Sequence, residues 1–260
     1  MTMTKNLSLY YHIWSPGGTD LWKLMVDEQL KRIYRNGLVE SASIYCAING
    51  PQANRIAEYV SIYDWLNVLD VSIDESEYEG FTLKRAYEEA HFNPDLKAIA
   101  YLHTKGISHM CGVRDHYSDR KFRAVNSWRH QMEWGILDRW KEAVEKLDEY
   151  QVSGVNYCLD PWPHMSGNFW WARADYLKTL IHPTRDRFPN DNKDFGPIQR
   201  MNFEKWIGLN NPKSFSFYNA PFSYDFKGMI PDVQPTPPGE PHWFWLYRDD
   251  IEPYYRKEGK

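Results

Sequence analysis

The sequence contains few of the residues that build disulfides and cysteine-metal sites. Its three cysteines, Cys46, Cys111 and Cys158, are far apart in the 260-residue chain and form no CxxC pair. A disulfide framework requires paired cysteines, and a cysteine zinc site requires closely spaced ligands. We therefore expect three free thiols and a reducing compartment.

Long apolar runs and an excess of one charge are also missing. No apolar run reaches the roughly 18 residues that a membrane span requires, and the N-terminal stretch MTMTKNLSLYYHIW has no signal-peptide core. The 31 Lys and Arg residues face 35 Asp and Glu residues, which gives a net charge of −4. Because no basic field is available, we expect a cytoplasmic protein with no transmembrane segment and no nucleic-acid partner.

The motifs of several common enzyme classes are missing as well. The sequence has no GxGxxG after its first predicted strand, no P-loop motif and no GxSxG. These absences exclude a Rossmann dinucleotide site, a P-loop nucleotide site and the nucleophile elbow of α/β hydrolases. What the chain has in abundance is aromatic residues, with 12 Trp, 18 Tyr and 12 Phe. Such side chains fill a core, and they also stack on sugar rings and bases.

Apolar runs and amphipathic stretches alternate in the first 105 residues. We predict strands over residues 7–14, 41–48, 66–73 and 97–102, and helices after Asp20, over residues 52–62 and around residues 81–90. Such alternation is typical of right-handed crossovers and a mostly parallel sheet. We therefore predict an α/β fold in which helices flank a mostly parallel central sheet.

The second half follows a different pattern. Residues 119–150 form a long amphipathic region that Gly135 divides into two predicted helices, and strands are expected over residues 152–159 and 168–172. Helices are predicted from Ala174 and over residues 202–208, where Glu204 would lie near the helix start. Because no linker interrupts the chain, we expect one domain of two lobes over residues 1–230, with an extended tail over residues 231–260 packed on it.

Polar residues follow several of the predicted strands. In open α/β sheets, ligands bind beyond the carboxyl ends of the strands. The residues at those ends are His12, Asn49, Asp74, Glu75 and the segment His103–Gly106. Lys105 suits a diphosphate as a point charge, Gly106 lets the backbone approach an anion, and Thr104 adds a hydroxyl donor. The alternative interpretation of this segment is a polar turn without a ligand.

The segment HMSGNFWW suits a polyol ligand. His164, Ser166 and Asn168 can donate and accept hydrogen bonds, and Trp170 or Trp171 offers a stacking face. Both tryptophans equally suit a core, because the alternation of a strand turns only one of them toward a given face.

Two further features have alternative interpretations. Glu204 suits a general base, and it also suits a favourable partner for a helix dipole. The cluster of His103, His109, Cys111 and His116 suggests zinc, but it lacks the closely spaced ligand pairs of structural zinc sites.

Three segments occur in a characteristic order: YLHTKG (Tyr101–Gly106), HMSGNFWWARADYL (His164–Leu177) and EKWIG (Glu204–Gly208). Together they resemble a group of GT-A-type glycosyltransferases, and the HTK element is similar to one in rhamnan-synthesis-type polysaccharide proteins. The resemblance spans residues 7–210 of the chain. It implies a GT-A-like fold with a nucleotide-sugar half over residues 7–110 and an acceptor half over residues 111–230.

The resemblance also implies roles for individual residues. Glu204 resembles the acidic residue that serves as base in inverting GT-A enzymes. The expected donor-binding residues are His12, Glu79, Thr82, His103, Thr104, Lys105 and Gly106. The expected acceptor-binding residues are His164, Ser166, Gly167, Asn168, Trp170 and Trp171.

The sequence departs from the GT-A pattern where a divalent metal usually binds. Most GT-A enzymes carry a DxD pair at the end of the fourth strand, whereas this chain has His103-Thr104-Lys105 there. A requirement for Mg²⁺ or Mn²⁺ therefore depends on ligands from Asp74, Glu75, Glu77 or Glu79. Without a metal, the lysine would neutralise the leaving nucleoside diphosphate.

These features predict an enzyme that transfers a hexosyl or pentosyl group from a nucleotide sugar to a glycan or lipid-linked glycan. Its expected role is the synthesis of a surface or capsular polysaccharide. Inversion at the anomeric carbon fits a glutamate base. A lipid-linked acceptor would bring a cytoplasmic protein to the membrane periphery. One alternative is a non-catalytic glycan-binding module that uses the aromatic residues as platforms. Another is a phosphoryl-transfer or nuclease enzyme built on the histidine cluster, against which the lack of clustered carboxylates argues.

Overall fold

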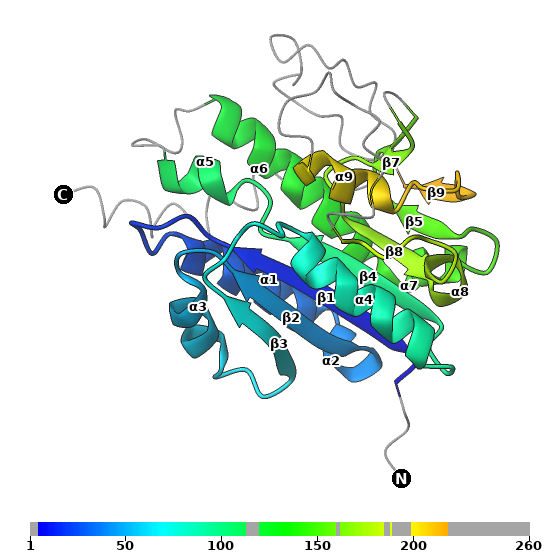
Figure 1. The fold of residues 1–260 in the computed structure, drawn as a ribbon, viewed down its shortest axis with the longest axis horizontal. Helices are drawn as coiled ribbons and strands as arrows, with labels where there is room; N and C mark the ends of the chain where they lie inside the picture. Colours follow the sequence, from blue (N-terminus) through cyan, green and yellow to red (C-terminus); the bar gives the residue numbers. More distant parts are fainter. Residues whose placement is uncertain (1–4, 113–119, 160–161, 185–187, 189–198, 218–260) are drawn as a thin grey trace.

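The central element is a seven-stranded sheet with helices on both faces (Figure 1). The computed structural model describes residues 5–112, 120–159, 162–184, 188 and 199–217. The strand order is β3-β2-β1-β4-β8-β5-β9. The seven strands are β1 (Leu7–Trp14), β2 (Ser43–Asn49), β3 (Leu66–Ser72), β4 (Ala98–His103), β5 (Val152–Gly154), β8 (Trp170–Arg173) and β9 (Ser214–Ser216). A separate two-stranded ribbon pairs β6 (Tyr157–Cys158) with β7 (His164–Met165).

Helical segments connect the strands. They are α1 (Trp22–Arg35), α2 (Leu38–Ser41), α3 (Ala53–Val60), α4 (Gly80–Phe92), α5 (Ile107–Gly112), α6 (Arg120–Glu133), the π-helical turn η1 (Trp134–Asp138), α7 (Trp140–Lys146), α8 (Ala174–Leu177) and α9 (Gln199–Trp206). Within the described residues, no helix combines the length and apolar character needed to cross a bilayer.

The strands β3, β2, β1 and β4 are parallel, as the alternation in the first half predicts. In the register between β1 and β4, His12 lies opposite His103, so the prediction that these histidines share one edge is confirmed. The strand β8 then runs antiparallel to both β4 and β5. The prediction of a mostly parallel central sheet with flanking helices is therefore confirmed.

Each face of the sheet carries its own apolar core. Leu9, Tyr11 and Ile13 of β1 are buried with residues of α1, η1 and α7 on one face. Tyr10, which alternates with them, is buried on the opposite face with residues of α4, α8 and α9. This division follows from the two-residue period of a strand.

The second half differs from its prediction at two places. The strand expected over residues 152–159 is broken into β5 and β6, because Asn156 adopts a left-handed conformation with φ of 59°. The helices expected on either side of Gly135 are joined by the π-helical turn η1. A Cβ atom at Gly135 would lie 2.3 Å from the Val155 side chain, so the glycine allows this turn to pack closely against the chain after β5.

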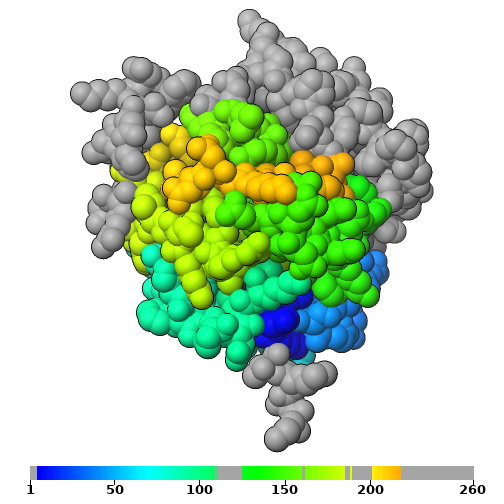
Figure 2. All heavy atoms as spheres, turned by 90° about the vertical axis from the view of Figure 1, so that its right-hand side faces the viewer, coloured from blue at the N-terminus to red at the C-terminus, as the bar shows by residue number. Residues whose placement is uncertain are grey.

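The last described strand, β9, forms the edge of the sheet opposite β3. The strand β9 pairs in parallel with β5 at one edge. In Figure 2 the orange band that includes β9 crosses the middle of that face of the molecule. The predicted tail over residues 231–260 lies outside the described residues.

Candidate functional site at the carboxyl ends of β1 and β4

Two histidines begin the site. His12 ends close to Thr82 of α4, with 2.8 Å between His12 Nδ1 and Thr82 Oγ1. His103 lies beside it, with Nδ1 3.3 Å from Glu79 Oε1 and Nε2 3.0 Å from the Gly167 carbonyl oxygen. All of these side chains are buried. The strand ends, the start of α4 and the turn before β8 therefore converge on one point.

Glu79 is the buried anchor of this cluster. Only 4% of the residue is exposed, and its Oε2 accepts hydrogen bonds from Tyr101 Oη at 3.2 Å and Asn168 Nδ2 at 2.5 Å. Burial raises the pKa of Glu79 most, and the negative charge of Glu204 raises it further, whereas Lys105 opposes both effects. Glu79 was expected to bind the donor, and these protein donors occupy its carboxylate.

The Ser166-Gly167-Asn168 segment forms a tight turn rather than the start of the expected strand. Gly167 and Asn168 both have positive φ, of 84° and 61°. Asn168 donates to Glu79 and also accepts a hydrogen bond from Trp170 Nε1 at 2.8 Å. A Cβ atom at Gly167 would lie 2.3 Å from Met132 Sδ, so α6 closes directly on the turn. Ser166 is buried, and its backbone N–H donates to the Asn156 carbonyl.

An ion pair closes the cluster on the other side. Lys105 Nζ lies 3.3 Å from Glu204 Oε1, and each side chain is only 11% exposed. The same ammonium lies 4.8 Å from the centre of the Trp128 ring, within range of a cation–π contact. Gly106 has φ of 87°, and a Cβ atom there would lie 2.7 Å from Val125, so its observed role is to allow this turn.

Glu204 lies near the carboxyl end of α9, not near its start as the sequence predicts. The difference arises because the helix begins at Gln199, three residues earlier than expected. The partial negative charge at a helix carboxyl end disfavours a carboxylate, so the dipole explanation of this glutamate is wrong. Lys105 supplies the opposite charge that holds it there.

His164 of β7 also lies within electrostatic range of this pair. Burial lowers the pKa of His164, so the ring is neutral at neutral pH, while Glu204 raises that pKa and Lys105 lowers it. Its Nδ1 is 2.7 Å from the Trp162 carbonyl oxygen, to which a neutral ring must donate. The Nε2 atom is consequently the acceptor nitrogen of His164.

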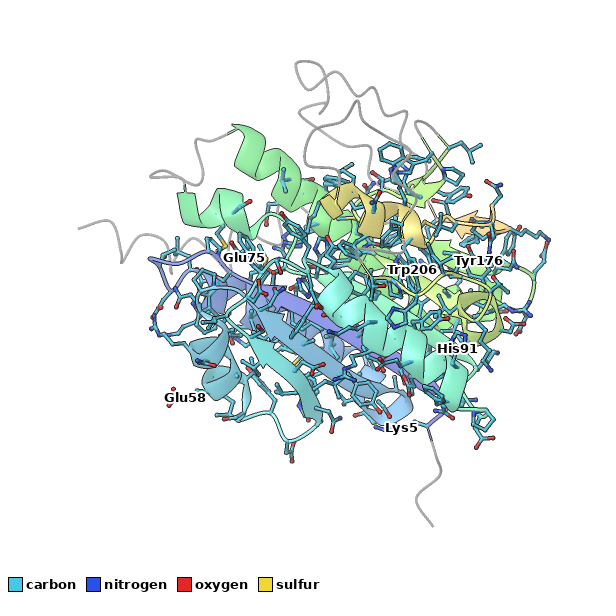
Figure 3. All side chains as sticks on the ribbon, in the orientation of Figure 1. Lys5, Glu58, Glu75, His91, Tyr176 and Trp206 are labelled. Carbon is cyan, nitrogen blue, oxygen red and sulfur yellow. The ribbon has the colours of Figure 1, made fainter. Side chains whose placement is uncertain are left out.

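Three predicted ligand contacts need correction. The Thr104 hydroxyl donates to the Trp14 carbonyl and accepts from the Trp14 N–H, so it clamps β1 to β4 instead of facing a ligand. Trp170 and Trp171 are both fully buried, one in each core. Neither ring therefore presents a face to a sugar. Trp206, labelled in Figure 3, packs 6.1 Å from the Trp170 ring between α9 and the sheet.

The acidic segment before α4 does not gather into a metal site. Asp74 accepts from Ser76, Glu75 accepts from Trp14 Nε1 at 2.7 Å near the end of the sheet (Figure 3), and Glu77 pairs with Lys84. Only Glu79 of this segment enters the buried cluster. His109, Cys111 and His116, the other members of the predicted zinc cluster, have side chains outside the described part of the chain.

Among the described residues, one group of three has the residue types and the spacing of a metal site, and it was not predicted from the sequence. Glu28, His130 and Glu133 bring ligand atoms within 4.8 Å of one another between α1 and α6. Arg129 already binds both carboxylates, at 2.6 Å from Glu133 and 3.0 Å from Glu28, and Arg32 lies 3.0 Å from Glu133. Two guanidinium groups occupy the oxygens that a cation would need, so this cluster does not fit a metal.

The same charged cluster supports the site from behind the sheet. Gln29 Nε2 donates to Glu133 at 2.7 Å and to the carbonyl oxygen of His103 at 3.2 Å. The Tyr11 hydroxyl donates to Gln29 Oε1 at 2.5 Å. The end of β4 is thereby fixed to α1 and α6, the helix that carries Trp128.

A hollow of about 540 Å³ lies beyond the carboxyl ends of β1 and β2. Its lining residues are Gly17, Gly18, Thr19, Asp20, Pro51, Gln52 and Arg55. Asp20 pairs with Lys23 and Arg55, and Gln52 donates to the Thr19 carbonyl, so the two loops are held together. The buried end of β2 is fixed in turn by Asn49, which donates to the Tyr78 carbonyl.

The chain is an α/β protein in which polar side chains cluster beyond the carboxyl ends of parallel strands. This is the edge of the sheet where α/β proteins bind their ligands. The chain belongs to the family described as Domain of unknown function (DUF8361), which matches residues 10–220. No curated protein matches the sequence.

Two solved structures are similar in part. One, from Desulfovibrio desulfuricans G20, is described as a candidate nucleotide-diphospho-sugar transferase; it is 9% identical with a TM-score of 0.44, over 83% of this chain and 81% of that chain. The other is a 4-diphosphocytidyl-2C-methyl-D-erythritol synthase from Anaerococcus prevotii DSM 20548. It is 9% identical with a TM-score of 0.43, over 88% of this chain and 94% of that chain.

Proposed function

We propose that the protein is a glycosyltransferase that moves a sugar from a nucleotide-sugar donor to a glycan or lipid-linked glycan acceptor, in the synthesis of a surface or capsular polysaccharide. The observation that carries the proposal is the contact between Lys105 and Glu204, a cation and a carboxylate brought together from two of the three resembling segments. Both side chains are largely buried beyond parallel strand ends, where α/β proteins bind ligands. A diphosphate leaving group needs such a cation, and an acceptor hydroxyl needs such a base.

The reaction is proposed as a single displacement. The acceptor oxygen forms a bond to the anomeric carbon while the bond from that carbon to the diphosphate breaks. The hydroxyl proton passes to Glu204, and the electron pair leaves with the nucleoside diphosphate beside Lys105. Attack from the side opposite the leaving group inverts the anomeric carbon.

The surrounding residues have supporting roles in the proposal. The hollow between Gly17 and Arg55 receives the nucleoside, because it opens at the same edge of the sheet as Lys105. His164 and Ser166 lie on the acceptor side, where a neutral imidazole nitrogen suits a sugar hydroxyl. His12, Thr82, His103, Glu79 and Asn168 hold these segments in place through their mutual hydrogen bonds.

A non-catalytic glycan-binding module is the weaker candidate. Such a module needs an open aromatic platform, and the two tryptophans that suggested one are buried in the cores. The described acidic residues around Asp74 contact separate partners, so the proposal assigns the diphosphate to Lys105, and the assay in EDTA tests this assignment.

The test uses a panel of nucleoside diphosphates and their sugars with the purified protein. We expect at least one nucleoside diphosphate to raise the melting temperature in EDTA, and the matching nucleotide sugar to be slowly hydrolysed. Glu204→Gln should lower turnover by roughly 10²-fold or more, the usual scale of general base catalysis. Lys105→Met should weaken nucleoside-diphosphate binding by about tenfold to a hundredfold, since a charge-assisted contact is worth about 1.5–3 kcal/mol.

Glu149→Gln is the matched control, because Glu149 pairs with Lys213 on the exposed surface just before β5, at the amino end of a strand that runs parallel to β4. Its turnover and binding should equal those of the wild type. Full turnover in Glu204→Gln would remove the base from the proposal. Binding that EDTA abolishes and Lys105→Met leaves unchanged would assign the diphosphate to a metal instead of the lysine.

A further inference from the structure

The ion pair between Lys105 and Glu204 joins the two groups that the proposed reaction uses separately. The Lys105 ammonium lies 3.3 Å from the Glu204 carboxylate that should accept the proton. A carboxylate paired with a cation is a weaker base, and a cation paired with a carboxylate attracts a phosphate less strongly. This contact therefore weakens Glu204 as a base and Lys105 as a cation for phosphate.

The charges around Lys105 and Glu204 determine how a diphosphate can approach the lysine. Two carboxylates, Glu79 and Glu204, influence one another electrostatically, and Lys105 lies close enough to act on both. A diphosphate adds further negative charge to the same largely buried space. Coulomb interactions are strong there because little water screens them. The diphosphate can approach the lysine favourably only if Glu204 gives up its share of that ammonium.

We infer that the donor's diphosphate displaces Glu204 from Lys105, so that the base is released only after the nucleotide sugar has bound. This inference rests on the proposed glycosyltransferase function and adds an order of binding to it. Lys105 can make the exchange locally, because its side chain needs only to turn from one anion to another while Trp128 stays beside it. Once this ammonium no longer engages the carboxylate, Glu204 is a stronger base toward the acceptor hydroxyl.

The exchange has a second consequence for the acceptor. Until the donor binds, Glu204 is held by the lysine and cannot take a proton from a hydroxyl. An acceptor hydroxyl or a water molecule that binds before the donor finds Glu204 paired with Lys105, so its proton is removed less readily. Ordered binding with donor first follows from the contact itself, without a moving loop.

The experiment measures nucleoside-diphosphate affinity by calorimetry in EDTA for the wild type, Glu204→Gln, Lys105→Met and the double variant. The probe is whichever of the uridine, guanosine, cytidine and thymidine diphosphates binds the wild type most tightly. Removing the competing carboxylate should tighten binding by about tenfold, the scale of one charge-assisted contact. In the Lys105→Met background the same substitution should have a much smaller effect, because the ammonium for which the two anions compete is gone.

Further variants keep the test decisive. Glu204→Asp retains the charge but shortens the side chain, so it should tighten binding by less than Glu204→Gln does. It also serves if the glutamine variant melts below the assay temperature. Glu149→Gln removes an equal charge at the surface and should leave affinity unchanged.

Each outcome bears on a different part of the inference. Tightening that persists in the Lys105→Met background would mean general repulsion by Glu204 and would overturn the exchange. Wild-type binding with no gain in either Glu204 variant would overturn it too, while leaving the proposed function standing. Binding of no nucleoside diphosphate to any of these proteins would refute the proposed function itself.

Discussion

Replacing Asn168 with alanine tests whether the buried turn holds the site together. Asn168 is fully buried, has φ of 61°, and contacts Glu79 and Trp170 through both ends of its amide. Loss of the amide leaves a buried indole N–H and a buried carboxylate without one partner each, at about 1–3 kcal/mol apiece. Alanine in the left-handed region adds about 1 kcal/mol. We therefore expect the free energy of unfolding to fall by about 3–7 kcal/mol.

Asn210 provides the matched control for this prediction. It has φ of 65° and donates to the Thr179 carbonyl at 3.0 Å, but it is exposed. Asn210→Ala therefore loses a similar backbone preference and a solvated hydrogen bond, together about 1–2 kcal/mol. Asn168→Gly keeps the left-handed turn but not the amide, so it should recover only the backbone part of the loss.

Urea unfolding of the three variants measures these differences directly. The informative quantity is the gap between Asn168→Ala and Asn210→Ala. If the two variants lose equal stability, the buried hydrogen bonds contribute nothing and the turn does not fix Glu79. If Asn168→Gly is as stable as the wild type, the amide contacts are likewise dispensable and the reasoning fails.

Two other predictions follow from buried groups near the site. Gly167→Ala should lower the midpoint of thermal unfolding far more than Gly18→Ala. Both glycines have positive φ, but a Cβ atom would lie 2.3 Å from Met132 at Gly167 and would meet nothing within 4 Å at Gly18. Equal shifts for the two variants would show that the contact between Gly167 and α6 relaxes freely. Burial, then Arg129, lowers the pKa of His130 to about 3 from 6.5, so the unfolded chain binds the extra proton and stability is lost as the pH falls below 6.5. Burial of Glu28 raises its pKa to about 7 from 4.5, which opposes this loss only down to pH 4.5. The free energy of unfolding should therefore fall steeply below pH 4.5 in urea titrations, and less steeply in His130→Gln; identical pH profiles for the two proteins would contradict the assignment.

The first half of the fold could be predicted from the sequence because its signals are local. Apolar runs such as Leu7–Trp14 are bounded by glycine, proline and asparagine, and the helices between them show their own period. The parallel pairing of β1 with β4 then brings His12 and His103 to one edge without further information. The edge that carries the site follows from this alternation, whereas the order of the strands in the sheet was not predicted.

The second half could not be predicted in the same way because distant contacts decide it. The run Val152–Leu159 looks like one strand, yet the chain turns at Asn156, whose carbonyl accepts from the Ser166 N–H. The start of α9, and with it the place of Glu204 in the helix, also carries no strong local signal.

The sequence predicted which residues lie in the candidate site better than it predicted which contacts their side chains make. Strand-end positions identified Lys105 and the histidines, whereas the hydroxyl of Thr104 is used by the backbone of Trp14. The cluster of Glu28, Arg129 and Glu133 was missed because its members come from two helices about a hundred residues apart. Only the polar residues within the apolar stripes of α1 and α6 could have indicated it.

The pairing of β4 with β8 has a consequence for how the protein is made. The strand β4 ends at His103, but the strand that covers it begins only at Trp170, and β9 at the far edge begins at Ser214. During synthesis the amino-terminal half must therefore leave the ribosome with one sheet edge uncovered and the Glu79 carboxylate without Asn168. Contacts between such distant segments slow folding and expose intermediates to aggregation. Fragments that stop before residue 170 should thus accumulate as insoluble material, although they contain every parallel pairing of the first four strands.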